Sequence, residues 1–98
     1  MLRITIDETG QAAVKMVLEG RIAGPWAEEL DRVWVEAAPE LGSRKLSIDL
    51  RSVTYADAGG KRVLRKIVSQ TNAELLTGTL STQDLAAELT RQAQKSVF

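Results

Sequence analysis

Few side chains in this sequence are suited to chemistry, and the clearest are two aspartates. The chain of 98 residues has no histidine and no cysteine, which removes the commonest general base, thiol catalysis and cysteine-based metal sites. Asp49 and Asp57 remain as a conceivable acid–base pair, but their spacing across a strand end and a loop does not fix the distance between the two carboxyl groups. We interpret Asp49 as a polar residue that closes a strand, and we expect no enzyme activity, no metal site and no cofactor.

The segment after Asp57 is unusual because two adjacent glycines stand where a helix should begin. Each glycine costs ~1 kcal/mol relative to alanine in a helix interior. Asp57 has two interpretations, which can hold together. It caps the helix by accepting hydrogen bonds from the N–H groups of Gly59 and Gly60, or it belongs to a partner-binding surface.

Four basic side chains follow on one face of this helix, namely Lys61, Arg62, Arg65 and Lys66. Such a run usually marks a solvated helix face, and that is our prediction. Binding of an acidic partner, or of a nucleotide phosphate at the helix start, is the alternative. The stretch AGGKR (58–62) lacks the G-x-x-x-x-G-K-[ST] spacing of a phosphate loop.

The elements that position these residues can be predicted from the hydrophobic pattern. Apolar residues alternate with polar ones over 2–6 and 14–18, which predicts two strands joined by a turn at 7–10 into an antiparallel hairpin. A helix follows, with Gly24 as its N-cap, Pro25 in its first position, and Pro39 with Gly42 closing it. Its predicted buried stripe consists of Trp26, Leu30, Val33, Trp34 and Ala37.

The second half repeats the alternation of strand and helix. A third strand is predicted over 45–50 and a fourth over 72–78, with a helix from Asp57 between them. The buried stripe of that helix consists of Val63, Leu64, Ile67 and Val68. A last helix over 81–95 is predicted to begin at Ser81 as N-cap with Asp84 three residues on, and to bury Leu85 and Leu89.

The order ββαβαβα predicts an α/β fold with a small mixed sheet of about four strands and helices packed on it. We expect one domain over residues 1–98. The 13 basic and 13 acidic residues balance, so net charge indicates neither nucleic acid nor an anionic membrane as a partner. No signal peptide or membrane span is recognisable, and we expect a soluble, cytoplasmic protein without direct membrane insertion.

Two motifs resemble a known family. The stretch LEGRI (18–22), followed by a helix and then LSIDLRSVTYADAGG (46–60), is similar to the STAS domain, the fold of bacterial anti-sigma-factor antagonists and of sulfate-transporter tails. The family pattern has an aspartate at the end of the third strand and a second one eight positions later, which opens a D-S-S-G segment. Asp49 and Asp57 have that spacing, and Val53 and Tyr55 fill the apolar positions between them. The resemblance covers residues 2–92 and implies a STAS-like fold.

The departure from the family pattern lies at the serines. A partner kinase phosphorylates the second serine of typical antagonists, and that position is Gly59 here; the first serine is Ala58, and Gly60 matches the family glycine. The resemblance therefore implies a degenerate phosphosite at Gly59 and a surface that stays in one charge state. Ser52, Thr54 and Tyr55 are the neighbouring hydroxyls that could be modified instead.

The resemblance implies a non-catalytic protein-interaction module in signalling and transcription regulation. Its partner would be an anti-sigma kinase or a similar signalling protein. The partner-binding residues it implies are Tyr55, Asp57, Ala58, Gly59, Gly60, Lys61 and Arg62. The alternative is an adaptor subunit of a membrane lipid (ABC-type) transporter, which would bind the transporter's ATPase subunit. A carrier of an apolar ligand is a third possibility, and the oligomeric state is left open.

Overall fold

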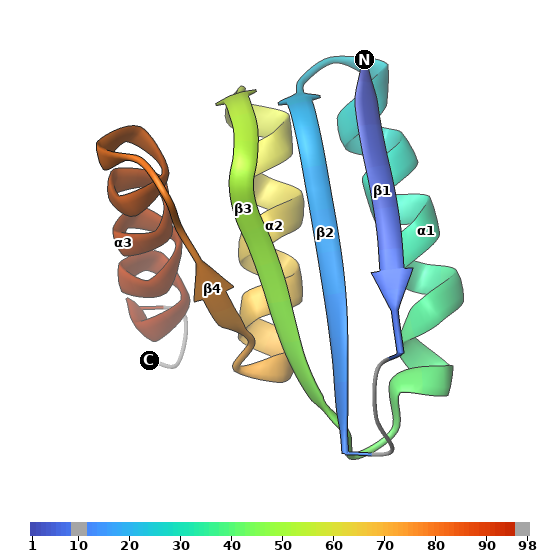
Figure 1. The fold of residues 1–98 in the computed structure, drawn as a ribbon. Coiled ribbons are helices and arrows are strands. Elements are labelled where there is room, and N and C mark those ends of the chain that lie inside the picture. Colours follow the sequence, from blue (N-terminus) through green and yellow to red (C-terminus); the bar gives the residue numbers. More distant parts are fainter. Residues whose placement is uncertain (9–11, 96–98) are drawn as a thin grey trace.

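The fold consists of four strands and three helices in the predicted order (Figure 1). It was obtained as a computed structural model, which describes residues 1–8 and 12–95. The strands are β1 (Leu2–Asp7), β2 (Ala13–Ile22), β3 (Lys45–Ala56) and β4 (Glu74–Leu76). The helices are α1 (Pro25–Leu41), α2 (Ala58–Thr71) and α3 (Leu80–Lys95). Part of the predicted turn at 7–10 and the tail 96–98 lie outside the described residues.

The sheet is mixed, as the sequence predicts. Its strand order is β1-β2-β3-β4. The hairpin of β1 and β2 is antiparallel, with Leu2 opposite Gly20 and Asp7 opposite Lys15. The pairs β2–β3 and β3–β4 are parallel, because a helix crosses over between the strands of each pair. Parallel pairing brings the C-terminal ends of β2 and β3 to the same edge of the sheet.

The core lies between one face of the sheet and the two helices that cover it. Figure 1 shows α1 behind β1 and α2 behind β2 and β3, while α3 lies beyond β4. Leu18 and Ile48 of the sheet, Leu30 of α1, Leu64 of α2 and Leu89 of α3 are fully buried. The opposite face of the sheet carries mostly polar side chains. No helix in the described part of the chain is long and apolar enough to cross a membrane.

Strand β3 continues to Ala56, six residues past its predicted end. Its pairing with β2 shifts twice, between Val17 and Glu19 and again between Gly20 and Arg21, and each shift adds an unpaired residue to β3. The buried side of β3 therefore passes from Leu50 to Val53, and the alternation typical of a strand disappears from the sequence. Tyr55 consequently faces outward and is 49% exposed.

Further details of the predicted elements are wrong. Helix α1 continues through Pro39 to Leu41, so of the predicted closing pair only Gly42 lies at the helix end, as its C-cap. Strand β4 is only three residues long. In the predicted α1 stripe, Trp34 is 3% exposed and its indole N–H donates to Gln70 Oε1 at 3.0 Å, but Trp26 is 37% exposed.

Another error is the start of α3. This helix begins at Leu80, and Ser81 does not cap it. Instead, Thr79 Oγ1 accepts from the Thr82 N–H at 3.1 Å, and Thr82 Oγ1 accepts from the Thr79 N–H at 3.0 Å. This reciprocal pair is a capping box in which threonine replaces the usual acidic residue or glutamine.

Candidate functional site

The start of α2 is held in place by one carboxylate. Asp57 caps the helix, and its Oδ1 accepts from the Gly60 N–H at 2.7 Å. Its Oδ2 accepts from the Gly24 N–H at 2.9 Å, which ties the starts of α1 and α2 together. These main-chain donors, Gly24 first and then Gly60, hold the pKa of the Asp57 carboxyl below its usual range. The predicted cap is confirmed for its bond from Gly60, and the bond to Gly24 is one that the sequence did not predict.

The two glycines after Asp57 have different environments. A Cβ on Gly60 would lie 2.1 Å from the carbonyl oxygen of Ile22 and 2.9 Å from its Cγ2. That carbonyl also accepts from the Asp57 N–H at 3.1 Å, so the helix start lies directly against the end of β2. A Cβ on Gly59 would meet only Asp57 Oδ1 at 3.5 Å and Ala27 Cβ at 3.8 Å, which are ordinary contacts. Glycine is therefore required at 60 by close approach but is not required at 59.

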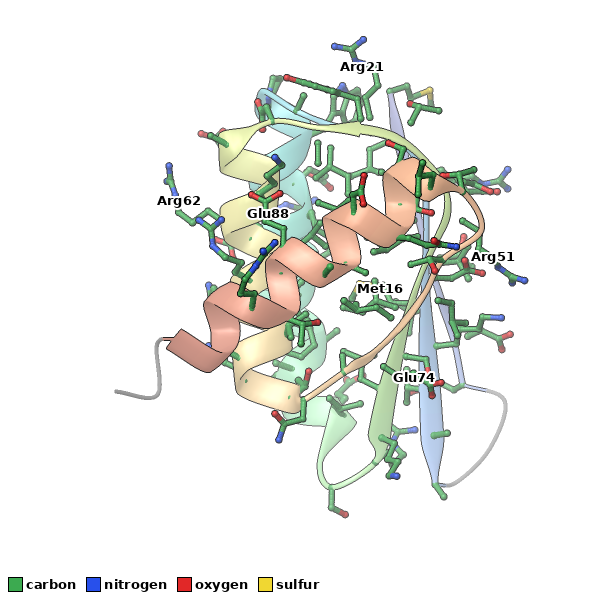
Figure 2. The ribbon with its side chains drawn as sticks, turned by 90° about the vertical axis from the view of Figure 1, so that its left-hand side faces the viewer. Met16, Arg21, Arg51, Arg62, Glu74 and Glu88 are labelled. Atoms are coloured by element: carbon green, nitrogen blue, oxygen red, sulfur yellow. The ribbon has the colours of Figure 1, made fainter. Side chains whose placement is uncertain are left out.

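Gly59 borders a surface groove between the two helices that cover the sheet, which we call the α1–α2 groove. It is lined by Gly24, Ala27, Glu28 and Asp31 from the α1 side, and by Gly59, Arg62, Val63 and Lys66 from α2. Acidic groups thus lie on one wall and basic groups on the other. Lys66 Nζ reaches Asp31 Oδ1 at 2.7 Å across the groove, while Arg62 extends from α2 away from the sheet (Figure 2).

Two other predicted site residues lie on the opposite side of α2. Tyr55 and Lys61 line a separate cavity of about 250 Å³ between the end of β3, α2 and the start of α3. Lys61 Nζ lies 3.2 Å from Glu88 Oε2 of α3, and the Arg21 guanidinium lies 5.0 Å from the centre of the Tyr55 ring. Lys61 and Lys66 of the predicted solvated face keep side-chain exposures of 33% and 41%, and each also forms an ion pair with a neighbouring helix.

The predicted surface is therefore divided. The structure brings Asp57, Gly59 and Arg62 to the groove side, and it places Tyr55 and Lys61 towards α3. Ala58 is exposed at the first position of α2, and Gly60 is buried against β2. The neighbouring hydroxyl residues Ser52 and Thr54 are exposed on β3.

Asp49 does not belong to this region. All the residues between it and Asp57 belong to β3, so eight residues of extended chain separate the two carboxylates by about 25 Å. Asp49 is only 6% exposed and accepts from the Arg51 N–H at 3.0 Å and from its guanidinium at 3.0 and 2.8 Å. The bonds to Arg51 outweigh burial and lower the Asp49 pKa to about 2. Asp49 is thus a structural anion on the open face of the sheet.

Some residues that build the site were not predicted, namely Ile22, Gly24 and Ala27. Each contacts the 57–60 segment across more than 30 residues of sequence. From the sequence, Gly24 was predicted only to be the N-cap of a helix. In the part of the chain that the structure describes, no three histidine, cysteine, aspartate or glutamate side chains converge as metal ligands would.

Comparison with known proteins gives the fold its class. No protein-family model matches the sequence, and no curated protein matches it. Solved structures do match, and they show that the chain has the α/β fold of STAS domains. One is the anti-sigma factor antagonist SpoIIAA in its unphosphorylated form, with a TM-score of 0.63, 9% identity, and coverage of 85% of this chain and 80% of that one.

A second structure, of a protein named Mglu, has a TM-score of 0.60 and 19% identity. The match covers 76% of this chain but only 19% of the Mglu chain. The same fold therefore occurs both as nearly a whole chain and as a small part of a longer one. Because the sequence identities are low, the similarity to these two structures shows the fold alone.

Proposed function

We propose that this chain is a non-catalytic protein-interaction module that binds a partner protein through the α1–α2 groove and the start of α2. The observation that carries the proposal is the position of Gly59. It lies beside the groove, next to the Asp57 cap, and an added Cβ there would make only ordinary contacts. By the resemblance of the motif, this position corresponds to the phosphorylated serine of typical antagonists, so the surface that a phosphate would alter is proposed to be the groove itself.

The partner is proposed from the fold and the resemblance together. SpoIIAA is an anti-sigma factor antagonist, and we propose a partner of the corresponding kind, an anti-sigma kinase or a related signalling protein. The groove offers a partner both signs of charge, since Glu28 lies on α1 and Arg62 on α2. Its contact residues would be Ala58, Gly59 and Arg62, with Asp57 and Gly60 holding the shape of the helix start.

The proposed surface has no phosphate switch. None of residues 57–60 has a hydroxyl group, so this segment keeps one charge state. Phosphorylation at the position of Gly59 would have added about 1.5 to 2 negative charges beside the Asp57 carboxylate. Without that change, the module stays competent to bind its partner, and its regulation would have to come from the partner or from another residue.

The test is affinity purification from the native cells followed by mass spectrometry, with the wild-type chain and two variants as baits. Gly59→Arg fills the groove at a position where a side chain fits, and Ala87→Arg adds the same charge at an exposed site on α3. We expect one soluble partner that Gly59→Arg loses and Ala87→Arg retains. Equal recovery by all three baits would contradict the proposed site. Recovery of a membrane transporter's ATPase subunit would support the adaptor role instead.

A further inference from the structure

We propose that two copies of this chain pair through the free edge of β1, antiparallel and around a two-fold axis at Thr5, to form a continuous eight-stranded sheet. This interface is separate from the α1–α2 groove and does not depend on the function proposed above. It rests on the main-chain geometry of β1, on its pattern of charges, and on the exposure of Ile6.

The main-chain groups of β1 point in known directions. β1 is an edge strand, paired only with β2. The Arg21 N–H donates to the Met1 carbonyl at 3.2 Å, so Met1 and every second residue after it bond towards β2. In an antiparallel ladder the alternate residues point the other way. The N–H and C=O groups of Leu2, Ile4 and Ile6 therefore face outward, without a strand beside them.

The outward-facing groups of β1 allow an antiparallel register centred on Thr5. With Thr5 opposite Thr5 of the other copy, Ile4 lies opposite Ile6, and both have outward-facing main-chain groups. The two symmetric Ile4–Ile6 pairs would form about four hydrogen bonds. A shift by one residue would place outward-facing groups opposite inward-facing ones, so odd shifts are excluded.

The charges on the open face select the same register. Arg3 and Asp7 flank Thr5 at equal distances in sequence, and both are exposed. The pairing puts Arg3 of each copy opposite Asp7 of the other, in the closely spaced class of pairs where side chains interact most. Asp7 already lies opposite Lys15 within its own hairpin, and Arg3 lies 3.7 Å from Glu19. Each charge at the junction would thus have an opposite charge on both sides.

The buried face of the edge is also incomplete in a single copy. Ile6 is 38% exposed and lines a cavity of about 280 Å³ beneath α1, whose lining includes the apolar Trp34 and Ala37 and the charged Glu8, Glu40 and Arg44. In the pair, Ile4 of the second copy would pack beside Ile6 and cover this opening. The two α1 helices would lie on the same face of the joined sheet, since α1 covers β1 in each copy (Figure 1).

The two-fold axis gives the test. Thr5 is exposed, so Thr5→Lys and Thr5→Glu should fold as the wild type does, which circular dichroism would check. Each variant places like charges directly opposite one another on the axis, and we expect its dimer to be about tenfold or more weaker than the wild-type dimer. A mixture of the two variants places lysine opposite glutamate and should recover the dimer.

The measurement is sedimentation equilibrium, with Thr54→Lys, exposed on β3, as the control. We expect the wild type and the control to reach twice the chain mass of 10.7 kDa, each Thr5 variant to stay near the single mass, and their mixture to return to the double mass. A wild type that stays monomeric up to millimolar concentration would overturn the proposal. Thr5 variants that dimerise as the wild type does, or a mixture that fails to recover, would overturn it as well.

Discussion

The two glycines after Asp57 look alike in sequence, but the structure predicts opposite responses to alanine. In Gly60→Ala the new Cβ would lie 2.1 Å from the Ile22 carbonyl oxygen, well inside the ordinary contact distance of about 3.5 Å. The clash is with main chain, so α2 has to move away from β2. That movement strains the core by ~1–3 kcal/mol and weakens the 3.1 Å bond from the Asp57 N–H to Ile22, worth ~1 kcal/mol.

Gly59→Ala should change the free energy of unfolding in the opposite direction. Its Cβ meets nothing closer than 3.5 Å, and alanine reduces the conformational freedom of the unfolded chain, so we expect a gain of ~0–1 kcal/mol. The two variants should differ by about 3 kcal/mol. With a urea m-value of about 1–3 kcal/mol/M, their unfolding midpoints should differ by about 1–3 M. Equal midpoints, or a Gly60→Ala variant as stable as the wild type, would refute the close-approach argument.

The remaining predictions concern three polar groups. In Asp57→Asn the side-chain oxygen can still cap at Gly60, but the amide NH₂ then faces the Gly24 N–H; we expect a Tm between those of the wild type and Asp57→Ala, and a Tm equal to the wild type would remove the bond to Gly24 from the account. The Asp49 pKa is lowered from 3.8 to about 2. The contribution of its carboxylate to the free energy of unfolding is therefore complete above pH 3.8 and is lost as the pH falls towards 2. Asp49→Asn should therefore lower the free energy of unfolding by ~1–2 kcal/mol in urea at pH 7. This figure allows for the weakening of the ion pair by solvent, since Arg51 is exposed. This loss of stability in Asp49→Asn should shrink as the pH falls below 4, and a loss that does not depend on pH would contradict the lowered pKa of Asp49. Thr79→Ala removes the cap of α3 and should cost ~1 kcal/mol, whereas Ser81→Ala should change stability little, and the reverse order would restore Ser81 as the cap.

The sequence predicted the order and type of every element, and for most of them the signal was a regular apolar period. Leu2, Ile4 and Ile6 alternate, and Leu64, Ile67 and Val68 recur with helical spacing. The apolar alternation does not predict a strand where the strand itself is irregular. Beyond Leu50 the two register shifts of β3 break the alternation, so the strand was predicted to end six residues early.

The site was predicted in part, for a physical reason. The Asp57 cap is a local bond across three residues, and local spacing predicts such bonds well. The contacts of Gly24, Ile22 and Ala27 with the same segment depend on how α1 and α2 pack, which no short stretch of sequence specifies. The ion pairs of Lys61 and Lys66 on the predicted solvated face were not predicted for the same reason, since their partners Glu88 and Asp31 belong to other helices.

The central claim is that the α1–α2 groove beside Gly59 binds a partner and lacks a charge switch. It is tested most directly by adding the missing charge alone. Gly59→Asp and Gly59→Asn have the same shape, and the Cβ of each would make only ordinary contacts, but only the aspartate puts a second carboxylate beside Asp57. Ala87→Asp adds the same charge elsewhere on the surface.

The measurement is the amount of the soluble partner that each of these baits recovers from native cells, by quantitative mass spectrometry. The account predicts that the wild type, Gly59→Asn and Ala87→Asp recover similar amounts, and that Gly59→Asp recovers about tenfold less or lower still, because the added carboxylate acts as the absent phosphate would. Equal recovery by Gly59→Asp and Gly59→Asn would contradict the claim that this surface binds the partner and that its constant charge matters.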